Sequence, residues 1–321
     1  MKNNSEIKKE AIDVLLLEAK ALEAMTKRIT DDFAEVVNTI LNLKGRVIVS
    51  GIGKSAIIAQ KIVATLNSTG TPAIFMHAAD AIHGDLGIIQ EDDLIIVISK
   101  SGNTPEIKVL IPFLKQTKNK LVAIVGNLNS FLAQQADFIL DTTVEREACP
   151  NNLAPTTSTT AQLAMGDALA VCLQTLRHFT DRDFAKYHPG GALGKQLYLK
   201  VKDVLSINGK PEVPSNASIR DVIISITKFR LGATVVTDNN QIVGIITDGD
   251  IRRMLENHQD TSILSAKDIM SQNPKNIEQD ELAINAFHKM KENSISQLIV
   301  LDQGEYVGIV HLQDLLKEGI I

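Results

Sequence analysis

Apolar runs alternate with amphipathic stretches along the first half of the chain. Several of these runs are continuously apolar, which is typical of strands buried on both faces of a parallel sheet. The predicted strands are RVIVS (46–50), PAIFMH (72–77), DLIIVIS (93–99), KLVAIVG (120–126) and DFILDTTV (137–144). Helical patterns lie between or after them, at 55–67, 105–118, 130–136 and 158–179. This order predicts an α/β fold with a doubly wound, parallel five-stranded sheet, whose ligands bind in the loops after the strands.

The second half of the chain contains an internal repeat. Residues 202–255 parallel residues 267–317, because each copy begins with KD and continues with a predicted helix, a strand, VGI and a second helix. A period of about 65 residues is too long for a solenoid and fits a pair of small α/β units. Before the sheet, residues 5–42 read as one or two amphipathic helices. We therefore expect a helical segment packed on a sheet domain, a glycine-rich linker and two repeats, at 1–42, 43–187, 188–200, 201–260 and 261–321.

The composition indicates a globular protein with an aliphatic core, since 44% of the 321 residues are hydrophobic, 4% are aromatic and tryptophan is absent. No apolar run approaches the roughly 20 residues that span a bilayer, and the charged N-terminus does not resemble a signal peptide. Cys149 and Cys172 are too few for a disulfide framework or a metal cluster. We expect a cytoplasmic protein without a membrane partner. Its net charge of −5 is unfavourable for nucleic-acid binding.

The first loop that indicates chemistry is VSGIGKS (49–55), where a predicted strand leads through glycines into a helix. Unpaired N–H groups and the helix dipole make such a turn an anion site. The P-loop pattern fails because Ile48 stands where its first glycine belongs. Gly51, Gly53 and Ala56 match the dinucleotide pattern, but the second predicted strand lacks the acidic residue that binds a ribose. A dinucleotide site and a turn that only packs helix on strand stay open as alternatives.

The segment SKSGNTPE (99–106) follows the most apolar predicted strand and opens a helix. Pro105 suits the first helical turn, where no N–H is required. Three hydroxyls and the N–H groups around Gly102 are suited to surround one phosphate monoester, whereas an N-cap explains only one hydroxyl. Together with GIGKS, this loop resembles the sugar isomerase (SIS) domain, which binds phosphosugars. The resemblance implies that the phosphate is held by Ser55, Ser99, Ser101 and Thr104.

Two histidines follow the second predicted strand. His83 lies in AIHGDLG, flanked by Gly84 and Asp85 instead of apolar residues, which favours a functional role. A lone histidine is nevertheless more often a structural hydrogen-bonding residue. His77 ends the strand, and the two imidazoles are potential zinc ligands, although two ligands do not make a metal site.

Two further loops carry candidate ionisable groups. Glu147 lies in VEREACPNNLAPTTSTT beside Ala148 and Cys149, where reduced solvation is expected to raise its pKa toward that of a useful base. Glu145, in the same segment, is more typical of an exposed ion pair. His188 lies in YHPGGALG, whose glycines give a backbone free to cover a ligand. A flexible hinge between domains is the alternative for that segment.

GIGKS, HGDLG, SKSGNTPE, REACPNNLAPTTSTT and YHPGGALGK, in this order, resemble the arabinose 5-phosphate isomerase family, and the two repeats resemble a tandem CBS pair. The resemblance covers nearly the whole chain. The family often has Ser-Asn-Ser-Gly-Glu where this chain has Ser-Lys-Ser-Gly-Asn, so Lys100 adds a cation near the phosphate. A hydroxyl such as that of Thr247 commonly helps CBS units to bind nucleotide phosphate, but the second repeat has His311 in its place.

The resemblance implies an aldose–ketose isomerase that interconverts D-ribulose 5-phosphate and D-arabinose 5-phosphate through a cis-enediol. The product leads to 3-deoxy-D-manno-octulosonate (Kdo), a sugar of lipopolysaccharide and some capsules. No cofactor is required, and zinc is expected only as an inhibitor, at His77. The CBS pair is expected either to bind a nucleotide or CMP-Kdo, at Thr247, Asp250 and Asp314, or to be purely structural. SIS domains pair through their helices, so a homo-oligomer, a dimer or tetramer, is expected.

The resemblance also marks the residues that matter for catalysis, and we assign their roles as hypotheses. Glu147 is the first choice for the base and His188 the second, with His188 suited to complete a neighbouring subunit's site. His83 polarises the sugar oxygens or opens the ring. Lys54 stabilises negative charge on the enediolate or phosphate, and Glu106 orients Lys54 or a hydroxyl.

The remaining substrate contacts are assigned to Gly70, Thr71 and again His83. Two rival functions stay open. One is a non-catalytic phosphosugar sensor, which the absence of a helix-turn-helix segment and the presence of the candidate base Glu147 make less favoured. The other is a SIS isomerase of a hexose phosphate, which the size of the pocket distinguishes.

Overall fold

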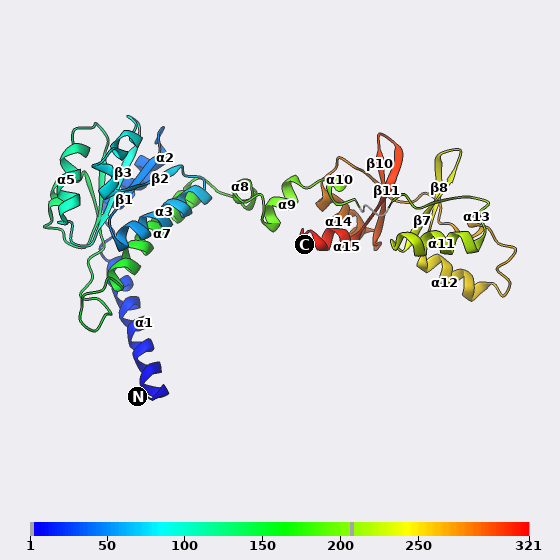
Figure 1. Ribbon diagram of the computed structural model, residues 1–321, viewed down its shortest axis with the longest axis horizontal. Coiled ribbons are helices and arrows are strands. Elements are labelled where there is room, and N and C mark those ends of the chain that lie inside the picture. The colour runs from blue at the N-terminus through cyan, green and yellow to red at the C-terminus, as the bar shows by residue number, and fades with distance from the viewer. Residues whose placement is uncertain (1–2, 206–208, 321) are drawn as a thin grey trace. The chain divides into compact units, whose positions relative to one another are not determined.

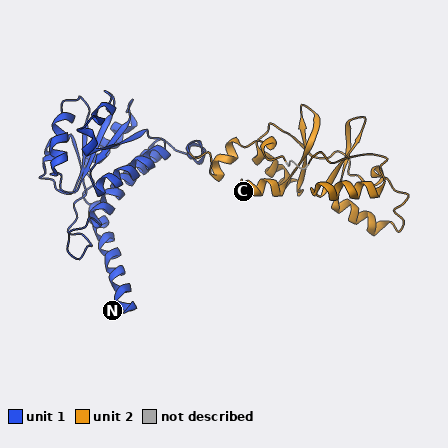
Figure 2. Ribbon diagram, in the orientation of Figure 1, with its two compact units in different colours: residues 1–187 blue, residues 188–321 orange. Residues whose placement is uncertain are grey.

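The computed structural model describes residues 3–205 and 209–320, so part of the first repeat, 206–208, lies outside the described residues. The chain divides into two compact units, residues 1–187 and 188–321 (Figure 2). In the described part, no helix is both long and apolar enough to cross a membrane.

Unit 1 is built on a five-stranded sheet in the order β2-β1-β3-β4-β5, with every pairing parallel. The predicted doubly wound α/β sheet is confirmed. All residues of the three central strands are buried, which explains why their sequences are continuously apolar. The strands are β1 (Val47–Gly51), β2 (Ala73–His77), β3 (Leu94–Ser99), β4 (Leu121–Val125) and β5 (Phe138–Asp141).

Helices cover both faces of this sheet (Figure 1). Alternate residues of each strand point to opposite faces, so Val47 and Val49 pack on one helical layer and Ile48 on the other. The first layer contains α2 (Asp31–Leu41), α3 (Lys54–Ser68) and α7 (Thr157–Leu176). The second contains α4 (Ala78–Ala81), α5 (Pro105–Leu114) and α6 (Phe131–Gln135), and the 3₁₀ helix η1 (Asp85–Ile88) follows α4.

Helix α1 (Asn4–Thr26) begins at a capping box between Asn3 and Glu6 and runs away from the body of unit 1 (Figure 1). Met25, near its C-terminal end, is its buried residue. Unit 1 ends with α8 (Asp181–Tyr187).

Unit 2 begins with α9 (Ala192–Tyr198) and contains two sheets of the same construction. In each, an antiparallel hairpin carries a register shift near its turn, and a short third strand pairs in parallel. The sheets are β6 (Glu212–Pro214), β7 (Ala233–Asp238) and β8 (Gln241–Thr247), then β9 (Asn276–Glu278), β10 (Gln297–Asp302) and β11 (Glu305–His311). The associated helices are α11 (Ile219–Phe229), α12 (Asp248–Asn257), α14 (Ala283–Glu292) and α15 (Leu312–Lys317).

The short helices that open the two sequence repeats, each at a KD motif, pack on the opposite repeat. Helix α10 (Val201–Val204), which opens the first repeat, packs its apolar residues into the core of the second. Helix α13 (Ala266–Ile269), which opens the second, packs into the first. Backbone bonds repeat the exchange, since Val201 N–H donates to the carbonyl of Glu281 and Ala266 N–H to that of Ala217, each at 2.9 Å. The sequence repeat is therefore offset from the packing units.

Candidate active site

A cavity of about 210 Å³ lies in unit 1, at the carboxyl ends of β1 and β3. Helices α3, α5 and α7 all begin next to it, so three positive helix ends face the same space. Hydroxyls and lysines dominate its lining, which makes it an anion site. The lining residues are Ile52, Lys54, Ser55, Ser99, Lys100, Ser101, Thr104, Pro155, Ser158 and Thr159.

The structure brings together the four hydroxyls that the sequence assigned to phosphate. Ser55 comes from the first turn of α3, and the other three come from the loop between β3 and α5. Ser99 Oγ accepts a hydrogen bond from Gly102 N–H at 3.0 Å, which holds the loop in a tight turn. Thr104 Oγ1 is buried and lacks a hydrogen-bond partner among the described residues. A hydroxyl in this position is available for a bound oxyanion.

Gly102 is required at the bend of this loop. Its φ is +63°, and a Cβ built there would lie 2.1 Å from Ser130 Oγ. A side chain at this position therefore displaces the start of α6 as well as straining the backbone. Ser130 Oγ also caps α6 by accepting a hydrogen bond from Ala133 N–H. The segment 99–104, called the phosphate loop below, therefore packs directly against the start of α6.

Helix α7 also contributes to the site, which the sequence did not predict. Ser158 and Thr159, from its first turn, line the cavity opposite the β3–α5 loop. Gln162, one turn further on, is buried and accepts a hydrogen bond from Ser55 Oγ at 3.1 Å. The hydroxyl-rich TTSTT at the start of a predicted helix was the available signal, because a helix that begins with several hydroxyls offers more donors than capping needs.

Glu147 is completely buried and lies behind the cavity, bonded to two residues that line it. Its Oε2 accepts hydrogen bonds from the N–H groups of Thr156 (2.9 Å) and Ser158 (3.1 Å), so the carboxylate caps α7. Its Oε1 accepts a 2.6 Å hydrogen bond from Ser158 Oγ and lies 2.6 Å from Lys100 Nζ.

These donors overturn the raised pKa that the sequence predicted for Glu147. Burial acts to raise the pKa, but the hydrogen bonds from Lys100, Ser158 and the backbone outweigh it and lower the pKa from 4.5 to about 2. The apolar neighbours in the sequence indicated the desolvation correctly. The donors come from residues distant in sequence, which the local pattern does not reveal.

The other candidate catalytic groups of unit 1 lie at the same edge of the sheet. Lys54 lines the cavity and is exposed. His83 is exposed on the turn after α4. Glu106 is half-buried in the first turn of α5, and in the described part of the chain no hydrogen bond joins it to Lys54. The roles of these three residues stay predictions.

His77 ends β2 and lies close to the acidic residue Asp80. Its Nδ1 lies 3.6 Å from Asp80 Oδ2, and its ring packs against the edge of Phe75. The described residues contain no cluster of three or more His, Cys, Asp or Glu side chains that could hold a metal ion. A zinc ion at His77 therefore needs donors beyond this pair.

Gly70 and Thr71 lie at the opposite edge of the sheet. They precede β2, whose five residues span roughly 16 Å at about 3.3 Å per residue. Thr71 is buried, and its Oγ1 accepts a hydrogen bond from Arg177, at the end of α7. Neither residue lines the cavity of its own chain, and their assignment as substrate contacts stays a prediction.

His188 is the first residue of unit 2, and its predicted role stays a prediction. The glycines that follow it form a tight turn. Gly191 N–H donates to the His188 carbonyl at 3.1 Å, and a Cβ on Gly194 would lie 2.2 Å from that carbonyl oxygen. Helix α9 is anchored beyond this turn, where Lys195 Nζ donates to the Glu318 carbonyl at 2.6 Å.

Unit 2 contains a second polar cavity, of about 520 Å³, between its repeats. Thr247 and His311 line it from equivalent positions, each capping the helix that follows. Thr247 Oγ1 donates to Asp250 Oδ2 at 2.7 Å, whereas His311 Nδ1 accepts from Gln313 N–H at 3.0 Å. Asp250 and Asp314 complete these capping boxes and are not among the lining residues. The full lining is Gly232, Thr247, Asp248, Gly249, Arg253, Ser294, Ile295, Ser296, Gln297 and His311.

Family models match the SIS domain at residues 40–172 and the CBS domain at 201–257 and 266–320. The fold and the cavity are thus those of a SIS protein that carries a tandem CBS pair. Among curated proteins, the chain is 47% identical to the Haemophilus influenzae "Probable arabinose 5-phosphate isomerase", covering 94% of this chain and 90% of that protein. It is 44% identical to arabinose 5-phosphate isomerase KdsD of Pseudomonas aeruginosa, covering 95% and 94%. The chain belongs to the arabinose 5-phosphate isomerase family.

A solved structure also resembles unit 1. It is c3406 of E. coli CFT073 in complex with arabinose 5-phosphate, which is 39% identical with a TM-score of 0.57. The match covers 59% of this chain and 100% of that chain.

Proposed function

We propose that the protein is an aldose–ketose isomerase that interconverts D-ribulose 5-phosphate and D-arabinose 5-phosphate through a cis-enediol. The observation that carries the proposal is the cavity of hydroxyls and lysines at three helix N-termini, in a chain whose full-length relatives are named for this reaction. The c3406 protein resembles unit 1, and the ligand in its complex is the aldose product of the same reaction. The reaction supplies arabinose 5-phosphate for Kdo and so for lipopolysaccharide or capsule.

The reaction moves a proton between C1 and C2, so it needs a base over the carbon and donors for the two oxygens. The hydroxyls of Ser99, Ser101 and Thr104 hold the phosphate at the end of β3. Lys54 stabilises the negative charge of the enediolate or the phosphate. Glu147 is the proposed base, with His188 as the second choice, and it reaches the cavity only if one of its present donors moves aside. The proposal requires no redox cofactor.

The test is proton exchange followed by NMR. The protein is incubated with ribulose 5-phosphate in deuterated buffer, and deuterium at C1 and C2 is followed together with the aldose formed. Arabinose 5-phosphate carrying deuterium at C2 is the expected result. Binding of the phosphosugar without exchange or product contradicts the proposal and favours a non-catalytic phosphosugar sensor. Faster turnover of fructose 6-phosphate than of ribulose 5-phosphate points to the hexose phosphate isomerase.

Zinc is proposed as an inhibitor and not as a cofactor. Its proposed ligands include His77, whose Nδ1 lies 3.6 Å from Asp80 Oδ2, a further oxygen donor. Activity that survives extensive dialysis against EDTA and falls on addition of zinc is expected. The His77→Ala variant should then resist zinc, and full dependence of activity on an added metal contradicts this part of the proposal.

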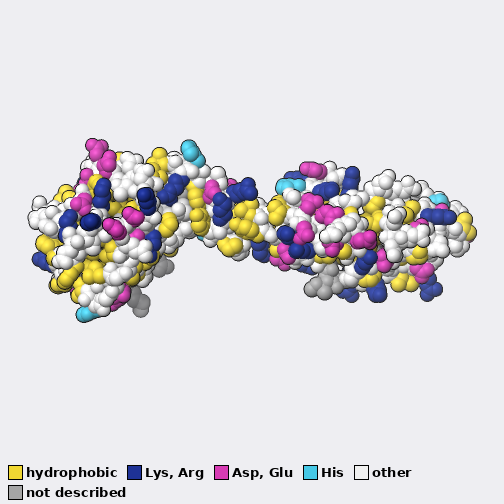
Figure 3. Space-filling model, turned by 90° about the horizontal axis from the view of Figure 1, so that it is seen from above, with side chains coloured by type: hydrophobic (Ala, Val, Ile, Leu, Met, Phe, Trp, Pro, Cys, Tyr) yellow, Lys and Arg dark blue, Asp and Glu magenta, His cyan; other side chains and the backbone are white. Residues whose placement is uncertain are grey.

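We also propose that the protein is a cytoplasmic homo-oligomer. Its two cysteines are free, as expected in a reducing compartment. Unit 1 exposes hydrophobic side chains in several places on the face drawn in Figure 3. The free end of α1 also carries exposed apolar side chains, Ile7, Ile12, Leu15 and Leu16, all more than half exposed. An isolated helical end of this kind is marginal in water, so burial against a second copy supports it.

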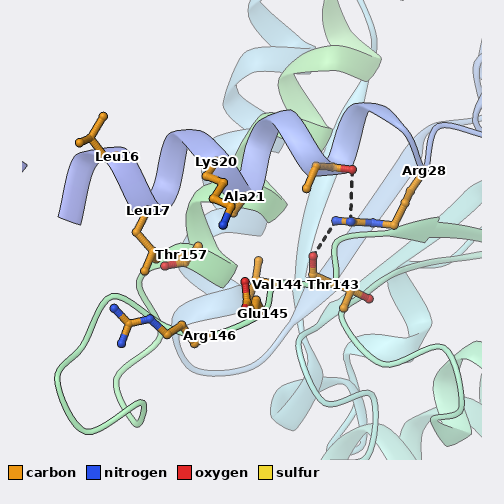
Figure 4. A pocket seen from close by; sticks show the side chains of 11 residues that line it. Leu16, Leu17, Lys20, Ala21, Arg28, Thr143, Val144, Glu145, Arg146 and Thr157 are labelled. Atoms are coloured by element: carbon orange, nitrogen blue, oxygen red, sulfur yellow. Dashed lines mark hydrogen bonds between the residues drawn. The ribbon is translucent and has the colours of Figure 1, made fainter. Parts of the chain in front are cut away.

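A groove of about 600 Å³ lies beside α1 from Leu16 to Ala24, between the helix and the strand-end loop at 143–146 (Figure 4). We propose that a second copy of the chain occupies it. Light scattering coupled to size-exclusion chromatography should show a dimer or tetramer. Leu16→Asp should weaken the assembly, whereas the matched surface change Leu255→Asp on α12, where the side chain is 61% exposed, should not. A monomer at micromolar concentration contradicts the proposal.

The cavity of unit 2 is proposed to bind a nucleotide or CMP-Kdo. Thr247 and Arg253 line it, so they supply a hydroxyl and a cation for the phosphate. Isothermal titration with AMP and with CMP-Kdo tests the proposal, and Arg253→Met should weaken binding by about tenfold or more. No heat with either ligand leaves a purely structural CBS pair.

A further inference from the structure

Lys100 belongs to two sites at once. Its backbone is fixed at the end of β3, where its carbonyl accepts a hydrogen bond from Gly126 N–H at 3.1 Å. Its side chain lines the cavity together with the hydroxyls of Ser99 and Ser101. Its Nζ lies 2.6 Å from Glu147 Oε1, and 44% of the side chain is exposed while that of Glu147 is fully buried. The cation therefore stands between the open cavity and the buried carboxylate.

The Glu147 carboxylate does not depend on this cation for its hydrogen bonds. Oε1 also accepts from Ser158 Oγ, and Oε2 accepts from Thr156 N–H, Thr156 Oγ1 and Ser158 N–H. If Lys100 moved away, each oxygen would keep at least one donor, so no buried polar atom would be left unpaired. Releasing Lys100 therefore removes the counter-ion of the carboxylate but leaves the α7 cap intact.

An anion in the cavity competes for the same cation. A phosphate monoester carries about −1.5 to −2 charges, more than a carboxylate, and attracts a lysine more strongly. Lysine has a flexible stem and three donors, so Nζ can turn toward a new partner without backbone movement. Lys54 is the other cation of the lining and comes from the first turn of α3.

We propose that Lys100 exchanges partners during the reaction, holding Glu147 while the cavity is empty and donating to the phosphate when the substrate enters. Lys100 is thereby a phosphate ligand and a positioning residue for Glu147. Binding of the phosphate, remote from the reacting carbons, makes the carboxylate more basic only when substrate is present. The inference rests on the proposed function in assigning a use to Glu147, but the exchange itself is independent of turnover.

The experiment titrates the Glu147 carboxyl with and without an anion in the cavity. The full-length protein is labelled with ¹³C at the glutamate side-chain carboxyls, and the Glu147 signal is assigned by its loss in Glu147→Gln. Sulfate is the probe, because it stays a dianion well below the pH of about 6 at which a phosphate monoester takes up a proton. The ionisable groups that face Glu147 are Lys100 and, on its own loop, Cys149. A thiol gives no carboxyl ¹³C signal, so a titration of Cys149 is not mistaken for that of Glu147.

Two results are expected. In the wild type, saturating sulfate should move the titration of Glu147 upward by about one pH unit or more. In Lys100→Met, the titration should already lie higher and should not respond to sulfate. The variant should also bind sulfate about tenfold more weakly or worse, as for loss of a hydrogen bond to a charged group. Lys100→Arg should bind sulfate nearly as well as the wild type.

The matched control is Lys115→Met, which removes a lysine ion-paired with Asp137 at 3.2 Å on the surface of the same unit. It should leave both measurements unchanged. A Glu147 titration that sulfate does not move in the wild type overturns the exchange, and so does undiminished sulfate binding by Lys100→Met. The wild-type titration needs no variant to fold beyond the one used for assignment. A wild type that shows the exchange but no isomerase activity overturns the proposed function alone.

Discussion

Each unit buries a carboxylate at a helix N-terminus, and the two are held differently. Asp250 in unit 2 is bound by Thr247 and Arg253, both within one turn of α12, and by Ser271 from the next repeat. Glu147 in unit 1 caps α7 from a separate loop and is paired with Lys100 from the end of β3. The cations of both pairs line a cavity. Asp250, however, belongs to the capping box of its own helix, whereas Glu147 joins two loops that are distant in sequence, so a ligand that draws Lys100 away changes the contact between those loops.

The largest effect should follow from removing the charge of Glu147. Glu147→Gln keeps the shape of the side chain but not the proton-accepting group, and loss of a general base typically costs about 10²- to 10⁴-fold in rate. The NMR exchange assay measures both deuterium incorporation and turnover. Unchanged exchange in this variant transfers the role of the base to another residue, with His188→Ala as the next variant to measure.

Acid should reveal the same carboxylate as a stability effect. The pKa of Glu147 is about 2 in the folded protein, below its ordinary 4.5, so its contribution is fully present above about pH 4.5. That contribution, roughly 3 kcal/mol, is lost as the pH falls from 4.5 toward 2. Calorimetry of unit 1 from pH 6 to pH 3 should show the loss, and Glu147→Gln should flatten the dependence. Parallel curves for the two proteins contradict the assignment.

Asp250→Asn should have a smaller effect, confined to unit 2. It weakens the bonds to Thr247 and Arg253 in a buried position, which costs about 1–3 kcal/mol. Calorimetry should show a lower unfolding temperature for unit 2, while isomerase kcat under saturating substrate stays within about twofold. A large loss of kcat removes the distinction between the two carboxylates, because it makes Asp250 a participant in the reaction.

The smallest expected effect concerns His311, the counterpart of Thr247. Burial lowers the pKa of His311 below its ordinary 6.5, opposed by Asp314 and assisted by Lys317, so the folded protein favours the neutral ring. Its Nδ1 accepts a hydrogen bond from Gln313 N–H, which a protonated ring cannot do. The stability of unit 2 from this cap, about 0.5–1 kcal/mol, is present above pH 6.5 and lost as the pH falls through the folded pKa. His311→Thr should remove the pH dependence measured by calorimetry between pH 7.5 and 5.

The strands of unit 1 were predictable because burial on both faces leaves a continuous apolar run, as in Leu94–Ser99. The phosphate loop was predictable because its hydroxyls are close in sequence and follow such a strand. The Lys100–Glu147 pair was not, since 46 residues intervene and only the folded sheet brings the loops together. The direction of the Glu147 pKa shift depends on that pair, so the prediction of a raised pKa was wrong for the same reason.

The placement of Gly70 and Thr71 shows a limit of prediction from sequence similarity. These residues were assigned by resemblance alone, and the parallel register of β2 with β1 puts them at the amino edge. The repeat, likewise, was visible as two KD segments, but sequence similarity could not reveal that each segment packs on the other copy. Similarity records which segments are related by duplication, whereas packing depends on which apolar faces meet.

The packing of α10 and α13 on the opposite repeats has a consequence for the folding of unit 2. As the chain leaves the ribosome, Val201 and Val204 appear first, but the core that covers them includes Ile277, Leu298 and Val310. The first repeat therefore cannot be completed until almost the whole polypeptide has been synthesised. The two repeats are interlocked, so neither can be excised as an independent module, and a chain truncated after the first would expose the apolar face of α10 to aggregation.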